Sequence, residues 1–255
     1  MKPTIFGTDS YQLFINLGTV FGSFAFFIAK YRRTKRIGQS FFSLAGCLAI
    51  FGIGAIAGEI VRTWNFWEFH SFSDFVHTMA TDRMGTHFAG RVLFAAWVFP
   101  AIYWLIKKFG KACLKSDVQS TYDAAAFYFV IQHIFDRIGC FLNGCCYGKY
   151  YAGFGSVVFP VVPGHYPVYP SQLMEAVAAA GALIFLLVRW KRQKPLFGWA
   201  LVLFGEIIFI SEFFMDQTGV LRIAGINMIQ VTAFLIILSG VFYIDKSKER
   251  EKKIS

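Results

Sequence analysis

The amino-acid sequence predicts an all-α polytopic membrane protein, a bundle of seven transmembrane helices, because of its composition and the length of its apolar stretches. The 255 residues are 56% hydrophobic and 19% aromatic, with a mean hydropathy of +0.52, far more apolar than a soluble domain. Seven stretches can each cross about 30 Å of hydrocarbon as a helix of about 20 residues. They are residues 11–31, 40–60, 85–106, 122–142, 170–189, 196–215 and 225–244. They leave room for one domain, residues 1–245, followed by a charged tail, residues 246–255.

Lysine and arginine residues alternate between the connections of these helices, and the alternation predicts the orientation. They cluster in residues 30–36, 107–115 and 189–194, which are the first, third and fifth connections, and again in the tail. The N-terminus and the even-numbered connections carry only Lys2, Arg62, Arg83, Lys149 and Arg222. By the positive-inside rule, the N-terminus is outside and the C-terminus is cytoplasmic. The net charge of +10 therefore indicates contact with anionic lipid headgroups and no nucleic-acid partner.

Ionisable residues inside the predicted helices indicate a site toward the outer face. A charge at membrane depth is costly and usually faces a protein interior or a watery cavity. His87 and Arg91 lie one helical turn apart, and His133 and Arg137 have the same spacing beside Asp136. For His87, a helix-capping role is the alternative. For Arg137, two interpretations stay open: a neutralised pair with Asp136 that locks the bundle, or a guanidinium that clamps an anionic group.

Four further polar residues lie in the last three predicted helices. They are Glu175, Glu206, Glu212 and Gln230. Acids deep in one bundle need partners, and Arg91 and Arg137 are the obvious ones. We therefore predict that Glu206 and Glu212 are structural counter-ions rather than catalysts.

Three of the five cysteines fall within seven residues, at Cys140, Cys145 and Cys146. The spacing C-x4-C-C matches no common zinc pattern, so we predict no metal, although His165 is a conceivable additional ligand. A disulfide is possible on an oxidising outer face, but adjacent cysteines are poorly placed to bridge each other. Packing as small polarizable side chains is the favoured interpretation.

The cysteines belong to the motif D-R-I-G-C-F-L-N-G-C-C-Y-G, residues 136–148, at the outer end of the fourth predicted helix. Within it, Arg137, Phe141, Asn143 and Gly148 are in register with the pattern G-R-x-x-N-F-x-N-x-E-x-x-G. The motif therefore resembles the signature of the prolipoprotein diacylglyceryl transferase family. Members of that family are polytopic bacterial enzymes with seven helices and an outside N-terminus, and this topology agrees with the charge distribution.

Shorter motifs resemble the same family in the same order along the chain. Y-P-S-Q-L-M-E at residues 169–175 is similar to the family's H-P-S-Q-L-Y-E, S-E-F-F at 211–214 to V-E-F-F, and N-M-I-Q at 227–230 to an M-G-Q element. His87, in T-H-F-A-G, stands where the family has H-G-G, and Tyr11 matches an N-terminal tyrosine. The resemblance thus spans nearly the whole chain.

The resemblance implies a transferase of the bacterial cytoplasmic (inner) membrane that needs no cofactor. Such enzymes move the diacylglyceryl group of phosphatidylglycerol to the lipobox cysteine thiol near the signal-peptide junction of a preprolipoprotein, and they release glycerol phosphate. It implies His87 as the base that accepts the thiol proton, Arg137 as the phosphate ligand and Tyr11 as a headgroup ligand. The further substrate-binding candidates are Arg91, Asn143, Gly148, Gln172, Cys140 and Cys145.

The chain departs from the family at positions within the expected site. Ile208 and Phe204 stand where the sixth helix of the family has an essential arginine and a tyrosine, and Arg91 is the candidate for the missing cation. Cys140, Cys145 and Phe88 stand where the family has asparagine, glutamate and glycine. Three alternatives therefore stay open: a related transferase with another acceptor, a transferase with a cysteine-linked intermediate, and a non-catalytic homologue that binds lipid or a partner.

Overall fold

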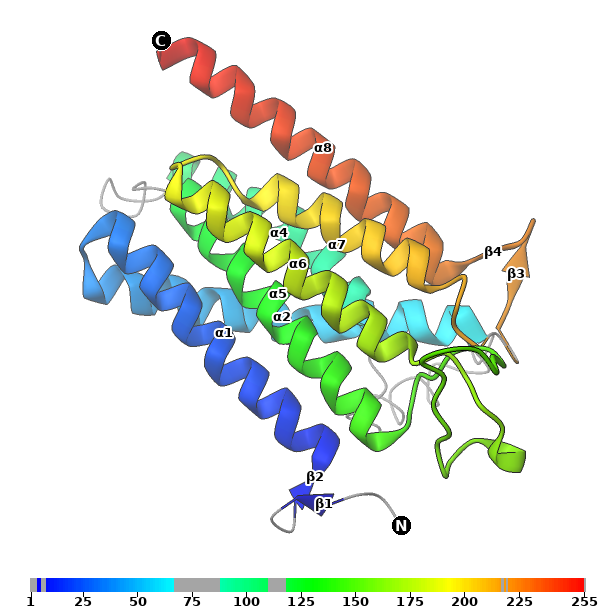
Figure 1. Cartoon of the computed structure of the whole chain (residues 1–255). Coiled ribbons are helices and arrows are strands. Elements are labelled where there is room, and N and C mark those ends of the chain that lie inside the picture. The colour runs from blue at the N-terminus through cyan, green and yellow to red at the C-terminus, as the bar shows by residue number, and fades with distance from the viewer. Residues whose placement is uncertain are drawn as a thin grey trace.

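Seven α-helices make up most of the residues that the computed structural model describes, which are residues 4–5, 8–66, 88–109, 118–216, 218 and 220–254. The helices are α1 (Ser10–Thr34), α2 (Ile37–Phe66), α4 (Phe88–Phe109), α5 (Val118–Asn143), α6 (Ser171–Lys191), α7 (Phe197–Ser211) and α8 (Met228–Ile254), and they form one bundle (Figure 1). Each coincides with one predicted stretch, which confirms the all-α class. The last helix continues through Ile254, so the charged tail extends α8.

Five of the described helices are long and apolar enough to cross a membrane: α1, α2, α5, α6 and α8. The apolar stretch of α7, Phe197–Ser211, is shorter, and that of α4 is described from Phe88 to Val98. Large apolar side chains are exposed on several helices, for example Phe24 on α1, Val177 on α6 and Phe242 on α8. A lipid environment accounts for both the length of the helices and their apolar outer surface. The chain is a multi-pass membrane protein.

Capping hydrogen bonds explain where α1 and α8 begin. Asp9 precedes α1, and its Oδ1 accepts a hydrogen bond from the backbone N of Tyr11 at 2.9 Å. At α8, Asn227 Oδ1 accepts from the Gln230 backbone N at 2.8 Å, while Gln230 Oε1 accepts from the Asn227 backbone N at 3.1 Å. This reciprocal pair is a capping box. Asn227 Nδ2 also donates to Glu212 Oε2 at 2.7 Å, so the N-M-I-Q motif ties α8 to the end of α7.

The sixth predicted stretch, residues 196–215, is about one turn too long, because α7 ends at Ser211. Beyond it the backbone turns toward the loop of residues 144–170. Lys149 N donates to Phe214 O at 2.8 Å, and Asp216 N donates to Tyr147 O at 3.2 Å. The apolar run continues through the turn, so hydropathy does not reveal the end of the helix.

The core is built around α5, which packs against α1 and α6, while α7 packs against α8 and α2 against α4. Ala124, Ala125 and Ala126 of α5 are completely buried. Between α7 and α8, a Cβ on Gly198 would lie 2.8 Å from the carbonyl oxygen of Gly240. Small residues therefore allow the backbones to approach closely, as is common between helices in membranes.

The two ends of the bundle carry different residues. At one end α1, α4, α6 and α8 begin, and the loop of residues 144–170 and the hairpins β1 (Thr4–Ile5) with β2 (Thr8–Asp9) and β3 (Arg222–Ile223) with β4 (Ile226–Asn227) lie there (Figure 1). We call this the motif end, because it holds the motifs at residues 136–148 and 169–175. The other end carries the basic connections 30–36 and 189–194, and we call it the basic end.

Candidate functional site

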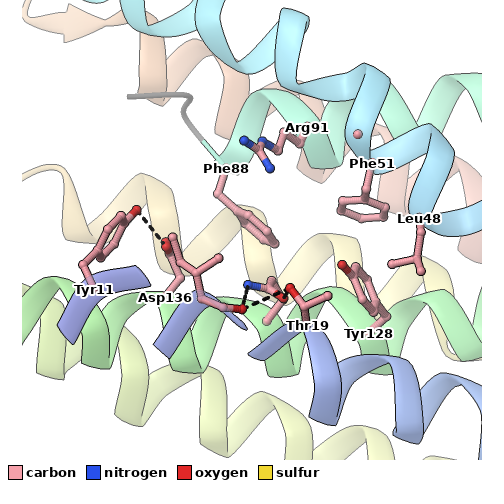
Figure 2. Close-up of a pocket in the computed structure, with 11 residues that line it drawn as sticks. Tyr11, Thr19, Leu48, Phe51, Phe88, Arg91, Tyr128 and Asp136 are labelled. Atoms are coloured by element: carbon pink, nitrogen blue, oxygen red, sulfur yellow. Dashed lines mark hydrogen bonds between the residues drawn. The ribbon is translucent and has the colours of Figure 1, made fainter. Parts of the chain in front are cut away.

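A cavity of about 270 Å³ lies among α1, α2, α4 and α5 and extends from the motif end into the bundle (Figure 2). Its apolar wall includes Leu48 and Phe51 of α2 and Phe88 of α4. Its polar lining residues come from α1, α4 and α5 and are Tyr11, Thr19, Arg91, Tyr128, Gln132 and Asp136. A cavity lined by both polar and apolar side chains is suited to an amphiphilic ligand.

Arg91 contributes a positive charge to this cavity. Figure 2 shows its side chain extending from α4, with Tyr11 of α1 and Asp136 of α5 on the opposite side. The hydroxyl of Tyr11 donates to Asp136 Oδ1 at 3.1 Å. A guanidinium presents several donors in a planar fork that matches phosphate oxygens. The structure thus brings together two residues that were predicted separately, Arg91 and Tyr11.

Tyr128 and Gln132 were not predicted from the sequence among the polar residues that line the cavity, although their spacing in the sequence indicates them. Tyr128 and Gln132 precede Asp136 at intervals of four residues, so all three lie along one face of α5. Gln132 joins this face to α1, because its Oε1 accepts from Thr19 Oγ1 at 3.1 Å and its Nε2 donates to Ile15 O at 3.2 Å. Polar residues recurring every fourth position of an apolar helix therefore mark the cavity.

Arg137 is engaged by a buried acid and does not line this cavity. Its Nε lies 2.8 Å from Glu175 Oε2, and the same oxygen lies 3.3 Å from His133 Nε2. All three side chains are buried, so the cluster joins α5 to α6. An acid within the helices does pair with Arg137, as predicted, and this acid is Glu175. Glu206, predicted as a counter-ion, is exposed on α7 instead.

Phe204 and Ile208, which the motif resemblance aligns with a tyrosine and an arginine, are buried in the apolar core. Phe204 and Ile208 are 2% and 1% exposed. The ring of Phe204 meets the rings of His133 and Phe88 edge to face, with centroids 5.0 and 5.8 Å apart. Phe88, which the motif resemblance aligns with a glycine, therefore packs in the same region as Phe204. Among the described residues, Arg91 supplies the cation of the cavity from a different helix.

The three cysteines of the motif converge at the end of α5. The chain turns there through left-handed conformations at Gly144 and Cys146, with φ of 71° and 56°. Two hydrogen bonds from the start of α6 hold the turn: Ser171 Oγ donates to Cys146 O at 3.0 Å, and Gln172 Nε2 donates to Cys145 O at 2.6 Å. As a result, the Sγ atoms of Cys140, Cys145 and Cys146 all lie within 4.8 Å of one another.

Cys145 has the electrostatic surroundings of a reactive thiol. Hydrogen bonds from Cys140 and then from Cys146, together with Asn143 and the positive charge of Arg137, lower the pKa of Cys145 from its ordinary value. A thiol becomes nucleophilic and binds metals when it loses its proton. Its neighbours therefore favour the thiolate form of Cys145.

The remaining predicted residues have distinct positions. Gln172 lies next to the turn at residues 144–146, which we call the cysteine turn. Its Oε1 is buried without a hydrogen-bond partner among the described residues, and the same is true of Asn143 Oδ1. Gly148 donates its backbone N–H to Tyr169 O at 2.9 Å, and a Cβ there would lie 2.7 Å from Phe214 O, so only glycine fits. His87 lies outside the described residues, directly before Phe88.

Comparison with known proteins agrees with the motif resemblance. A sequence model of the family described as prolipoprotein diacylglyceryl transferase matches residues 4–245. Three relatives, each named phosphatidylglycerol–prolipoprotein diacylglyceryl transferase, come from Chlorobaculum tepidum, Oleidesulfovibrio alaskensis and Pasteurella multocida. They are 31%, 31% and 34% identical to this chain, over 53%, 46% and 45% of its length.

The match covers 49%, 46% and 47% of those relatives, so the chain spans about half the length of the curated relatives it matches. The family model, in contrast, covers nearly all of the chain, from the hairpin before α1 to the C-terminal part of α8. The chain therefore belongs to the prolipoprotein diacylglyceryl transferase family.

Proposed function

We propose that this protein is a transferase that moves a diacylglyceryl group from phosphatidylglycerol to the lipobox cysteine thiol of a preprolipoprotein. The relatives carry the donor and the prolipoprotein acceptor in their names. The observation that carries the proposal is the cavity, because it combines a guanidinium and hydroxyl groups with an apolar wall inside a membrane bundle. A phospholipid has the same division into a polar anionic part and an apolar part.

In this proposal Arg91 binds the donor phosphate. The arginine of the sixth helix is absent, and Arg137 is held by Glu175 at 2.8 Å. Arg91 lines the cavity opposite the hydrogen-bonded Tyr11 and Asp136. A guanidinium stabilises the charge that develops on a departing phosphate, and it does so more strongly in a water-excluded cavity. Arg137 then acts as a positioning residue for α6 and the cysteine turn.

We further propose that all seven helices span the bacterial cytoplasmic (inner) membrane, with the N-terminus outside. Lysine and arginine are concentrated at the basic end, which supports a cytoplasmic location for that end. The motif end then faces the outer leaflet, where a preprolipoprotein presents its signal-peptide junction. This orientation places the donor cavity and the acceptor on the same side.

The acceptor thiol must lose its proton to become an effective nucleophile. His87 is the proposed base, because an imidazole can accept a proton near neutral pH and the residue directly precedes Phe88 of the cavity wall. The sulfur then attacks the glyceryl carbon, the bond from that carbon to the phosphate oxygen breaks, and glycerol phosphate leaves.

The direct test is transfer by the purified full chain in detergent, with phosphatidylglycerol and a synthetic lipobox peptide. Mass spectrometry should show a diacylglyceryl group on the peptide and equimolar release of glycerol phosphate, and a peptide with serine in place of cysteine should stay unmodified. Glu206→Gln, at an exposed position on α7, is the control variant and should keep full activity. An unmodified peptide with well-folded protein would show that the proposed activity is wrong.

A further inference from the structure

Cys140, Cys145 and Cys146 form a cluster that the proposed function does not use. Their Sγ atoms all lie within 4.8 Å of one another. Sulfur atoms that share one tetrahedral zinc ion lie about 3.8 Å apart, because each Zn–S bond is about 2.3 Å long. Side-chain shifts on the order of 1 Å therefore bring all three sulfurs to one ion. The sequence spacing disfavoured a metal, but the turn after α5 gives these residues a geometry that the spacing does not reveal.

The ligand set is held in place by its neighbours. Cys145 N donates to Cys140 O at 3.1 Å, which closes the turn around the cluster. Ser171 and Gln172 hold the carbonyl groups of Cys146 and Cys145. Residues that orient metal ligands in this way raise metal affinity, because little of the ligand freedom has to be lost on binding. Cys140 is buried whereas Cys146 is exposed, so an ion has a path from the surface to the innermost sulfur.

The charge of the site favours a divalent ion. Thiolate ligands select soft ions such as Zn²⁺ and Cu⁺. Three thiolates leave a net charge of −1 with a divalent ion and −2 with a monovalent ion. The nearby cation, Arg137, is already paired with Glu175. The net charge of −1 that a divalent ion leaves is therefore easier to accommodate at the end of a membrane helix than the net charge of −2 that a monovalent ion leaves.

The cluster also lies next to the donor cavity. Cys140 follows Asp136 of the cavity by one turn of α5, and a Cβ on its neighbour Gly139 would lie 3.3 Å from the ring of Tyr11, which also lines the cavity. A zinc ion with three protein ligands keeps a fourth position open for water or substrate. An open position here adjoins the site where the donor phosphate is bound in the proposed function.

We propose that Cys140, Cys145 and Cys146 bind one Zn²⁺ ion, and that the open fourth position binds the acceptor thiol. The second half of this proposal rests on the proposed function, whereas the first half does not. In the step, the acceptor sulfur would replace water on zinc and its thiol proton would pass to His87, the base of the proposed function, since a thiol that coordinates zinc is deprotonated. A bond then forms from the acceptor sulfur to the glyceryl carbon, and the carbon–oxygen bond breaks with its electron pair remaining on the phosphate. The neutral thioether is a weaker ligand than the thiolate and leaves the ion.

Metal binding is tested on the purified full chain with Zn²⁺ or Cd²⁺. We expect one ion per chain and sulfur-to-cadmium charge-transfer absorption in the ultraviolet. Cys145→Ser should weaken Cd²⁺ binding by about 100-fold or more, whereas Cys47→Ala, in the core of α2, should bind as the wild type does. Alkylation of the unmodified chain provides a test without a variant: Zn²⁺ should protect Cys145 and Cys146 from iodoacetamide, and a chelator should restore their labelling. Substoichiometric metal, or equal labelling with and without Zn²⁺, overturns the site.

Transfer assays separate this inference from the proposed function. We expect a chelator to abolish transfer, Zn²⁺ to restore it, and Cys145→Ser to lose it. Transfer that is indifferent to the chelator and to Cys145→Ser overturns the thiol-binding role and leaves the transferase standing. Stoichiometric metal binding with no transfer to any thiol peptide supports the metal site while it overturns the proposed function.

Discussion

The two ends of the bundle both bury charged side chains but use them differently. At the basic end, Lys30 is completely buried, and its Nζ donates to Ser120 Oγ at 2.6 Å and Thr121 Oγ1 at 2.8 Å. Asp123 pairs with Arg33 and also accepts from the backbone N of Leu196 at 2.8 Å. At the motif end, in contrast, Arg91 and Asp136 line a cavity.

The difference shows that a buried charge alone does not identify a functional site. Asp123 caps the start of α7 and balances Arg33, so its burial has a structural explanation. Arg137 and Glu175 have the same kind of explanation, although each lies in a motif that resembles one of the family, at residues 136–148 and 169–175. The cavity and the convergent thiols are what distinguish the motif end.

The largest effect on stability is expected for Arg137→Ala. Removing this side chain leaves Glu175 buried without its ion pair, which lowers the free energy of unfolding by about 3–5 kcal/mol. Thermal unfolding in detergent measures the change. The double variant Arg137→Met with Glu175→Leu should recover most of the loss, because both charges are then removed together. A single variant as stable as the wild type would mean that this pair does not join α5 to α6.

The largest effect on catalysis alone is expected for Arg91→Ala. Loss of one preorganised donor to the reacting phosphate should lower kcat/KM by about 10²–10³-fold, with little change in thermal stability. Arg91→Lys should retain part of the activity, since it keeps the charge but loses the planar fork. The matched change at the basic end is Arg32→Ala. Equal loss of transfer in Arg32→Ala would erase the proposed distinction between the two ends.

A smaller effect, on stability only, is expected for Asp123→Ala. The variant loses the cap of α7 and the ion pair with Arg33, which should cost about 1–3 kcal/mol. Transfer per folded molecule should be unchanged. Asp123→Asn keeps an oxygen for the backbone N–H groups of Leu196 and Phe197 and should lose less. If the Asp123→Ala variant folds but has a lower kcat, the basic end takes part in catalysis and the expectation is wrong.

The smallest effect is expected for Tyr11→Phe. This change removes the hydrogen bond to Asp136 but keeps the ring. Loss of the hydrogen bond should raise the activation free energy by about 0.5–1.5 kcal/mol, equivalent to a roughly 2- to 13-fold fall in kcat/KM. Steady-state transfer measures the effect. A loss as large as that of Arg91→Ala would place Tyr11 at the reacting atoms.

Hydropathy predicted a helix in each of the seven stretches, because each apolar run is bounded by charges or loop residues. It overextended α7, since the run continues past Ser211 and only the backbone pairing of Phe214 with Lys149 shows where the helix ends. The capping box of Asn227 and Gln230 was visible in the sequence as N-M-I-Q, but was interpreted only as similar to the family's M-G-Q element.

The site was less predictable, because its geometry depends on contacts between distant segments. The sequence named Glu175 among the acids that need a partner, yet only packing decides that it meets Arg137 and His133. The convergence of the cysteine sulfurs depends on left-handed conformations at Gly144 and Cys146. No spacing rule reports these backbone angles.

The most direct test of the donor site is a density map of the protein with bound phosphatidylglycerol. We expect the phosphate against Arg91 in the cavity at the motif end, with the acyl chains toward Leu48 and Phe51. The basic end offers an alternative position, a groove of about 610 Å³ lined by Arg32, Arg33, Trp190, Lys191 and Gln193. A phosphate found only in that groove would contradict the assignment of the donor site.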